Sequence, residues 1–125
     1  YYCLNLVTEP EGEPAAVLIR GIQSVAGQET MRRLRFGDVP MTAYRRKNFT
    51  NGPGKVCKAL GLSTVENRMD LTGDTLFVCD SPADIGLPEP PPTAQAMRCG
   101  KRIGIDYAGP DRELLWRFWL ESGDA

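Results

Sequence analysis

YYCLNLVTEPEGEPAAVLIRGI, residues 1–22, contains two apolar runs separated by a cluster of proline, glycine and glutamate. Residues 1–8 are rich in aromatic and aliphatic side chains, and residues 15–22 form the second apolar run. Both compositions are typical of β-strands, whereas the segment between them has the composition of a turn. We therefore expect the chain to begin with a β-hairpin.

Two polar side chains, Asn5 and Arg20, interrupt these apolar runs. Buried polar groups cost free energy unless they are paired, so such residues either are satisfied within a core or line a site. If the strands pair as a hairpin, Asn5 and Arg20 can lie near one another on the same face. The alternative is that each points to solvent at a sheet edge, which is the more common case for a single arginine.

The rest of the chain alternates between short helical and strand-like segments. Residues 27–36 predict a short helix, and residues 37–51 are expected to be irregular and basic. Residues 53–60 predict a second helix, because Pro53 stands near its start and Gly61 follows its end.

The second half of the chain contains further strand candidates. Residues 75–80 and 97–105 predict strands, whereas the proline-rich residues 81–92 predict an irregular loop. The segment LLWRFWLE, residues 114–121, is ambiguous between helix and strand, and its short length and aromatic content favour a strand. We expect its aromatic side chains to pack in the core. The pattern as a whole predicts a single mixed α/β domain over residues 1–125.

Composition limits the classes of function. The chain has 125 residues, is 42% hydrophobic and has a formal net charge of −1, so it fits one domain with a core and is not a polycation. Any contact with nucleic acid must therefore come from a local patch. Six basic residues that could form such a patch lie close together in the sequence: Arg32, Arg33, Arg35, Arg45, Arg46 and Lys47.

The cysteines, at positions 3, 57, 79 and 99, form no CxxC pair, and the chain has no histidine. This pattern matches no zinc module and argues against a metal site. Spread cysteines without a secretion signal are typical of reduced core residues in a cytosolic protein, with a disulfide framework as the alternative. No apolar run is long enough to span a membrane, so we expect a cytoplasmic protein.

Residues 46–62, RKNFTNGPGKVCKALGL, combine basic residues, a glycine-rich turn and a helix start. A helix N-terminus can bind phosphate through its unpaired N–H groups, and Lys55 adds a full positive charge there. The spacing is not that of a nucleotide P-loop, because Val56 follows Lys55. Two interpretations stay open: an ordinary turn with a helix cap, or a site for the backbone of a polyanion, which the preceding Arg45-Arg46-Lys47 favours.

Five segments, in the same order, resemble the 3-methyladenine (alkyladenine, or methylpurine) DNA glycosylases: YYCLNLVTEPEGEPAAVLIRGIQ, GQETMRRLR, FTNGPGKVCKALGL, RCGKRIGIDYA and WRFWLES. The resemblance implies a monofunctional hydrolase of base excision DNA repair. Such an enzyme flips a 3-methyladenine, 7-methylguanine or hypoxanthine out of duplex DNA and hydrolyses its N-glycosidic bond with an activated water. It also implies a single domain on a curved antiparallel sheet and action as a monomer through the minor groove of double-stranded DNA. No metal, cofactor or membrane is expected, and the implied setting is the nucleoid in a bacterial cytoplasm.

The resemblance further implies roles for individual residues. Asn5 matches the asparagine that crowds the purine edge and rejects the exocyclic amine of guanine. Arg20 matches the arginine beside the attacking water and the target nucleotide's phosphate. Leu120 falls where the family offers a backbone carbonyl to that water, and Tyr1 and Tyr2 match the aromatic pair after the intercalating hairpin tip.

The glycine-rich turn matches the loop and helix start that hold a DNA phosphate in this family: Asn51, Gly52, Pro53, Gly54 and Lys55. The family's water-activating glutamate, its base-stacking tyrosine and histidine, and its wedge tyrosine all precede the position matched by Tyr1. We therefore expect this chain to be the C-terminal two-thirds of such an enzyme and to be inactive alone. The alternatives are a non-catalytic nucleic-acid-binding module, similar to the C-terminal barrel of formyltransferases, and a degenerate homologue without activity.

Overall fold

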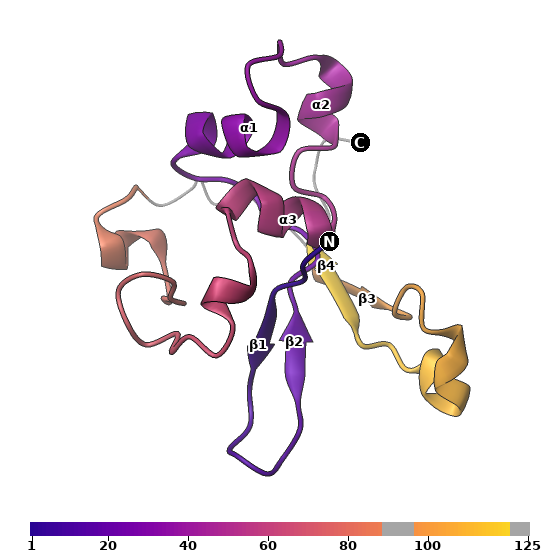
Figure 1. The fold of residues 1–125 in the computed structure, drawn as a ribbon. Helices are drawn as coiled ribbons and strands as arrows, with labels where there is room; N and C mark the ends of the chain where they lie inside the picture. Colours follow the sequence, from indigo (N-terminus) through magenta and orange to yellow (C-terminus); the bar gives the residue numbers. More distant parts are fainter. Residues whose placement is uncertain (89–96, 121–125) are drawn as a thin grey trace. The chain divides into compact units, whose positions relative to one another are not determined.

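The computed structural model describes residues 1–88 and 97–120, which belong to two compact units, Tyr1–Asp80 and Ser81–Ala125 (Figure 1). The first unit contains β1 (Asn5–Val7), β2 (Ala16–Leu18), α1 (Gln28–Phe36), α2 (Ala43–Lys47), α3 (Pro53–Leu60) and the 3₁₀ helix η1 (Thr64–Glu66). The second contains η2 (Pro82–Ile85), β3 (Met97–Gly100), η3 (Asp106–Glu113) and β4 (Arg117–Leu120). The expected fold class, mixed α/β with short helices and antiparallel strands, is confirmed.

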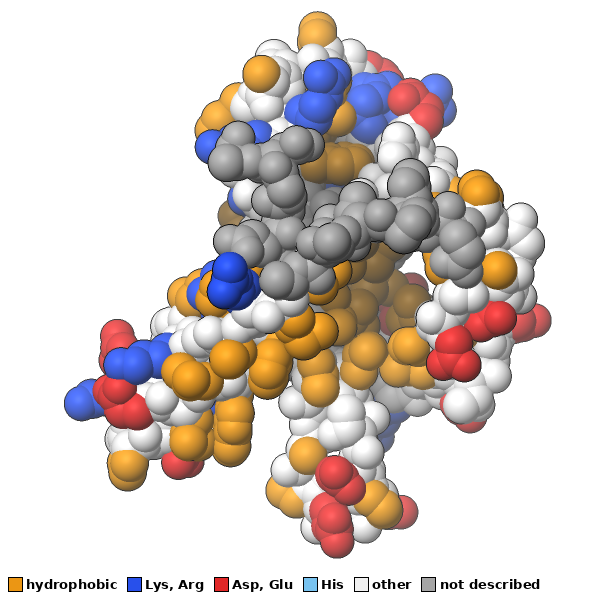
Figure 2. Space-filling view, turned by 180° about the vertical axis from the view of Figure 1, so that it is seen from behind, with side chains coloured by type: hydrophobic (Ala, Val, Ile, Leu, Met, Phe, Trp, Pro, Cys, Tyr) orange, Lys and Arg blue, Asp and Glu red, His pale blue; other side chains and the backbone are white. Residues whose placement is uncertain are grey.

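The hairpin expected at the start of the chain is confirmed, although its strands are shorter than the two apolar runs. β1 and β2 pair antiparallel, with Asn5 opposite Leu18. The pairing continues past the strand ends, because the N–H of Ile19 donates to the carbonyl of Leu4 at 3.0 Å. Figure 2 shows the acidic side chains of the connecting turn at the far end of this hairpin.

Helices α1 and α3 pack against each other and supply the core of the first unit. The buried apolar side chains come from these two helices: Met31, Val56, Cys57 and Ala59. Helix α3 has the bounds that the sequence predicts, and it ends at Gly61, whose φ of 66° is left-handed and suits glycine. Helix α1 begins one residue later than expected, because Gly27 is its N-cap.

Residues 37–51, expected to be irregular, contain the short helix α2. Its N-cap is Thr42, whose hydroxyl accepts a hydrogen bond from the N–H of Arg45 at 3.2 Å. At its other end the side-chain amide of Asn48 donates to the carbonyl of Tyr44 at 2.9 Å. A five-residue helix is too short to show an apolar period, so the sequence pattern missed it.

β3 and β4 form an antiparallel ribbon in the second unit, with Cys99 opposite Phe118. The strand interpretation of the LLWRFWLE segment is thus confirmed for residues 117–120, and the strand expected over 97–105 is confirmed for its first four residues. The strand expected at residues 75–80 is wrong, because these residues have neither helix nor strand structure. An apolar run forms a strand only where a partner strand completes its hydrogen bonds.

Two expectations about the core are also corrected. The aromatic side chains of the last segment are exposed: Trp116 by 60%, Phe118 by 63% and Trp119 by 39%. Among the cysteines only Cys57 is buried, and its burial, together with the nearby Cys3, raises the pKa of its thiol. The other three cysteines are exposed.

Candidate nucleic-acid interface

The hairpin register determines how Asn5 lies relative to Arg20. Asn5 faces Leu18, and continuing the register by two residues sets Arg20 opposite Cys3. Asn5 and Arg20 are then diagonal neighbours on one face of the hairpin, at a typical Cα separation of about 7–8 Å. Asn5 is exposed and Arg20 is half-buried. The register thus predicts that the two polar residues singled out by the sequence analysis lie near one another.

A hydrogen-bonded link joins the segment after Arg20 to the segment before the glycine-rich turn. The N–H of Ile22 donates to the carbonyl of Thr50 at 3.2 Å, and the hydroxyl of Thr50 donates to the carbonyl of Ile22 at 2.6 Å. A Cβ on Gly21 would lie 3.3 Å from the Thr50 carbonyl oxygen and 3.8 Å from the Asn51 Cα, so only glycine fits comfortably. The link therefore fixes the chain beside Arg20 next to the start of the turn.

Thr50, at the centre of this link, is buried with 8% exposure. The sequence analysis did not identify it, because a single threonine in a polar loop carries no periodic signal. The only sequence signal is its position directly before the glycine-rich turn.

The turn itself leaves the N-terminus of α3 uncapped by any side chain. Pro53 has no N–H, so the N–H groups of Gly54 and Lys55 are the first donors without an acceptor inside the helix. The ammonium group of Lys55 donates to Oδ1 of Asn51 at 2.9 Å, which holds this positive charge over the turn. The arrangement offers an anion two backbone donors and one cation.

The two glycines of the turn differ in what the fold requires of them. Gly52 has φ −170°, which suits any residue, and a Cβ there would lie 3.6 Å from the Lys55 Cδ, an ordinary contact. A Cβ on Gly54 would lie 3.1 Å from the Cδ1 of Tyr1, which is closer than most real contacts, although Tyr1 is otherwise fully exposed. Packing therefore leaves less room for a side chain at Gly54 than at Gly52.

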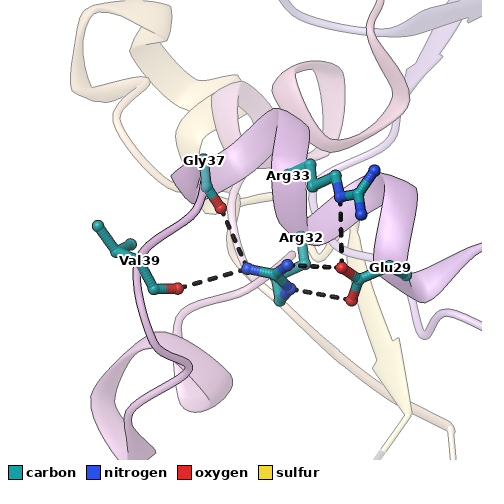
Figure 3. A network of polar contacts seen from close by, with 5 residues as sticks. All are labelled: Glu29, Arg32, Arg33, Gly37 and Val39. Atoms are coloured by element: carbon teal, nitrogen blue, oxygen red, sulfur yellow. Dashed lines mark hydrogen bonds and ion pairs between the residues drawn. The ribbon is translucent and has the colours of Figure 1, made fainter.

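The six basic residues at positions 32–47 do not form one patch. The guanidinium of Arg32 forms two hydrogen bonds to the carboxylate of Glu29 and also donates to the carbonyls of Gly37 and Val39 at 3.1 and 3.3 Å (Figure 3). Arg33 forms a second ion pair with the same carboxylate at 3.4 Å. The hydrogen bond from Arg32 lowers the pKa of Glu29 and raises that of Arg32.

Arg35 and Arg45 also bind carbonyl groups of the protein. Arg35 donates to the carbonyl of Phe49 at 2.8 Å and to that of Asn48 at 3.0 Å, and burial lowers the pKa of its guanidinium. Arg45 donates to the carbonyl of Pro40 at 2.6 Å. Arg35 thus connects α1 to the chain before the glycine-rich turn, and Arg45 connects α2 to the loop between α1 and α2, so both are structural residues.

A hollow of about 310 Å³ lies along β1 and the chain that follows α3. Among the site residues expected from the sequence, it is lined by Asn5 and Tyr2, and not by Arg20. Its other polar lining residues include Glu66 and Arg68, and the Glu66 carboxylate accepts hydrogen bonds from the N–H and hydroxyl of Ser63. That carboxylate therefore caps the 3₁₀ helix η1.

Leu120 ends β4, opposite Met97, and it lies in the second unit. Its proposed carbonyl role beside Arg20 therefore stays a prediction. Within residues 1–88 and 97–120, no three side chains of His, Cys, Asp or Glu are close enough to share a metal ion. In the same part of the chain, no helix combines the length and the apolar character needed to cross a membrane.

Comparison with known proteins identifies relatives along nearly the whole chain. Residues 1–124 match the family model described as methylpurine-DNA glycosylase (MPG). A protein of Clostridium acetobutylicum is 41% identical over 124 residues, covering 98% of this chain and 56% of that protein. Proteins of Bacillus mycoides and Clostridium perfringens are 39% and 40% identical, and this chain covers 58% of each. All three carry the provisional name 3-methyladenine DNA glycosylase.

This chain thus spans a little over half the length of the curated relatives that it matches. The match of the family model and the identity to these relatives agree with the resemblance found in the hairpin and in the glycine-rich turn. The chain belongs to the methylpurine-DNA glycosylase family.

Proposed function

We propose that the protein is a monofunctional DNA glycosylase of base excision repair. Its substrates would be alkylated or deaminated purines of the 3-methyladenine, 7-methylguanine and hypoxanthine class in duplex DNA. The observation that carries the proposal is the link through Thr50, which fixes the Arg20 segment beside the glycine-rich turn. A base-flipping enzyme must hold the DNA backbone and the extruded nucleotide at the same time, and this link joins the two candidate contacts.

In this proposal, each predicted residue has a distinct role. Arg20 positions the attacking water and contacts the phosphate of the target nucleotide, and the backbone carbonyl of Leu120 also faces that water. Asn5 crowds the purine edge and rejects the exocyclic amine of guanine. Tyr1 and Tyr2 are aromatic residues of the substrate-binding region, which approaches the DNA from the minor groove. The protein acts as a monomer in the bacterial cytoplasm.

The glycine-rich turn holds a DNA phosphate in this proposal. Two features support it: the uncapped N–H groups at the start of α3 and the ammonium group of Lys55 beside Asn51. Since packing does not require glycine at position 52, we attribute Gly52 to the close approach of the phosphate to the backbone.

The reaction also needs a group that activates the water, and the resemblance attributes this role to a glutamate. We propose that this glutamate lies in the part of the relatives that residues 1–125 do not span. A positioned general base of this kind contributes about 10²–10⁴-fold to the rate.

Release of free base from duplex DNA tests the proposed function. In the protein at its full natural length, we expect single-turnover release of hypoxanthine from a lesion duplex and none from the undamaged duplex. Arg20→Ala should lower that rate about 100-fold, as loss of one group that stabilises the transition state does in other enzymes. Arg112→Ala is the matched control, because this exposed arginine lies in the second unit beside Glu113. Equal affinity for both duplexes without release of base would identify a plain backbone-binding module and overturn the proposal.

A further inference from the structure

Of the six basic residues at positions 32–47, two have side chains that do not bind another group in the part of the protein that the structure describes. Arg32, Arg35 and Arg45 donate to backbone carbonyls, and Arg33 pairs with Glu29. The remaining two basic residues are Arg46 and Lys47. Both are exposed in the last turn of α2, and neither side chain forms a hydrogen bond or ion pair with any residue that the structure describes.

The stretch of sequence around these two residues contains basic side chains and no acidic ones. The net charge of the whole chain is −1, yet residues 39–65 contain no aspartate or glutamate. The same stretch contains five basic residues: Arg45, Arg46, Lys47, Lys55 and Lys58. The space-filling view also shows Lys and Arg side chains in the region of α1 and α2 (Figure 2). A surface segment with one sign of charge in a chain of balanced charge is complementary to a polyanion.

A chain of side-chain hydrogen bonds connects α2 to the glycine-rich turn. The amide of Asn48, at the end of α2, donates to the carbonyl of Tyr44 at 2.9 Å. Its Oδ1 accepts a hydrogen bond from the amide of Asn51 at 3.4 Å, and the Oδ1 of Asn51 accepts one from Lys55 at 2.9 Å. The end of α2 is therefore the immediate neighbour of the lysine at the start of α3.

This segment is also fixed in place. Arg35 holds the carbonyls of Asn48 and Phe49, and the ring of Phe49 stacks against that of Phe36 with centroids 6.1 Å apart. Thr50 is held by Ile22. Cations on a fixed segment lose less conformational freedom when they bind than cations on a free loop.

We propose that Arg46 and Lys47 form a second contact with the DNA backbone, which continues from Lys55 along the same duplex. The proposal rests on the proposed function, because it takes duplex DNA as the polyanion. The two cations contribute to affinity for any sequence and do not contribute to recognition of the lesion, since phosphates carry no sequence information.

A purely structural role for these residues is the main alternative. Basic side chains in the last turn of a helix interact favourably with the helix dipole. In that case Arg46 and Lys47 would affect the stability of α2 and leave the salt dependence of DNA binding unchanged, so the two roles have different readouts.

The experiment compares variants of the protein at its full natural length by fluorescence anisotropy, on lesion and undamaged duplexes over a series of salt concentrations. The test variant is Arg46→Ala/Lys47→Ala. The matched control is Lys101→Ala/Arg112→Ala, which removes the same two charges from residues that already pair with Glu113 in the second unit. A charge-preserving variant, Arg46→Lys/Lys47→Arg, and the single variant Lys55→Ala complete the set. Thermal unfolding shows whether each variant is folded.

We expect the slope of log K against log salt to fall in magnitude by about 1.8 in the double variant, because each phosphate contact contributes about 0.9. Affinity should fall equally for both duplexes. The control and the charge-preserving variant should keep the parental slope, and Lys55→Ala should lower it by about 0.9.

This inference would be overturned, and the proposed function left intact, if the folded double variant kept the parental salt slope while Lys55→Ala reduced the magnitude of that slope. A larger loss of affinity for the lesion duplex than for the undamaged one would also contradict it. A parental protein that binds neither duplex would overturn both proposals together.

Discussion

At the scale of single residues, alternation along a strand determines which side chains are neighbours. Because side chains alternate and Asn5 pairs with Leu18, the register continued past β2 sets Asn5 and Arg20 on one face of the hairpin. This proximity could be anticipated from the sequence, once a hairpin was assumed. The role of Thr50 could not, because its two hydrogen bonds reach Ile22, which is 28 residues away in the chain.

Substitution of Asn5 tests whether this side chain sets specificity. Asn5→Ser shortens the side chain, so a clash with the exocyclic amine of guanine should be relieved. We expect release of guanine or alkylated guanine, relative to hypoxanthine, to rise about 10-fold or more in the protein at its full natural length.

The matched control is Asn67→Ser, because Asn67 lines the same hollow as Asn5 but comes from the C-terminal end of η1. This control should leave the ratio of the released bases unchanged. Mass spectrometry of the bases released from one mixed substrate measures that ratio. If Asn5→Ser also left it unchanged, the clash account of guanine rejection would be wrong.

At the scale of elements, the arginines connect helices more than they build a charged surface. Arg32 links α1 to the loop that follows it, through the carbonyls of Gly37 and Val39 (Figure 3). Arg35 and Arg45 both lie over the ring of Phe36, at 4.5 and 5.9 Å from its centroid. The cation–π contact of Arg45 connects α2 to the last residue of α1. The sequence pattern grouped these residues as one basic patch, whereas each has a separate partner in the fold.

The ion pairs of Glu29 predict a pH dependence of stability. Because Arg32 lowers the pKa of Glu29 below its ordinary value of 4.5, the folded state binds this proton less tightly than the unfolded state does. The stabilisation is therefore present above about pH 4.5 and is lost as the pH falls through the lowered pKa of the folded state.

Glu29→Gln should remove this contribution. We expect a decrease in Tm of about 1–3 °C near neutral pH, since the Glu29 side chain is largely exposed, and no difference at about pH 2. Thermal unfolding across this pH range measures it, with Glu11→Gln in the acidic turn of the hairpin as the control. A decrease of equal size at every pH would show that Glu29 acts through packing and not through its charge.

At the scale of the whole molecule, the distribution of charge and the length of the chain relative to its relatives determine what function can be expected of it. The net charge of −1 hides a stretch of 27 residues, 39–65, that contains only basic charges. The chain also spans a little over half of its curated relatives. Binding of the DNA backbone and cleavage of the glycosidic bond are therefore expected to separate, because the proposed phosphate-binding residues are within this chain and the general base is proposed to lie outside it.

If the general base lies outside residues 1–125, these residues alone should be inactive. Without the general base, release of hypoxanthine should fall by about 10²–10⁴-fold relative to the protein at its full natural length. Single-turnover assays of both proteins at equal folded concentration measure this, with circular dichroism as the check of folding. Release by residues 1–125 at the rate of the longer protein would show that the water is activated by a group within this chain.

The sequence by itself determined the elements whose signals are local. The hairpin, α1, α3 and β4 follow from apolar runs, glycine and proline positions and helix caps, because these act over a few neighbouring residues. It also determined the family, since the ordered motifs of the hairpin and the glycine-rich turn are specific to it.

Only the tertiary structure decided how these elements are combined. It determined that residues 75–80 form no strand, that α2 exists, and that most of the basic residues at positions 32–47 bind within the protein. These outcomes depend on hydrogen-bond partners that are distant in sequence, such as the carbonyl of Phe49 for Arg35. A local pattern shows which groups need a partner, and only the folded chain shows which partner each one finds.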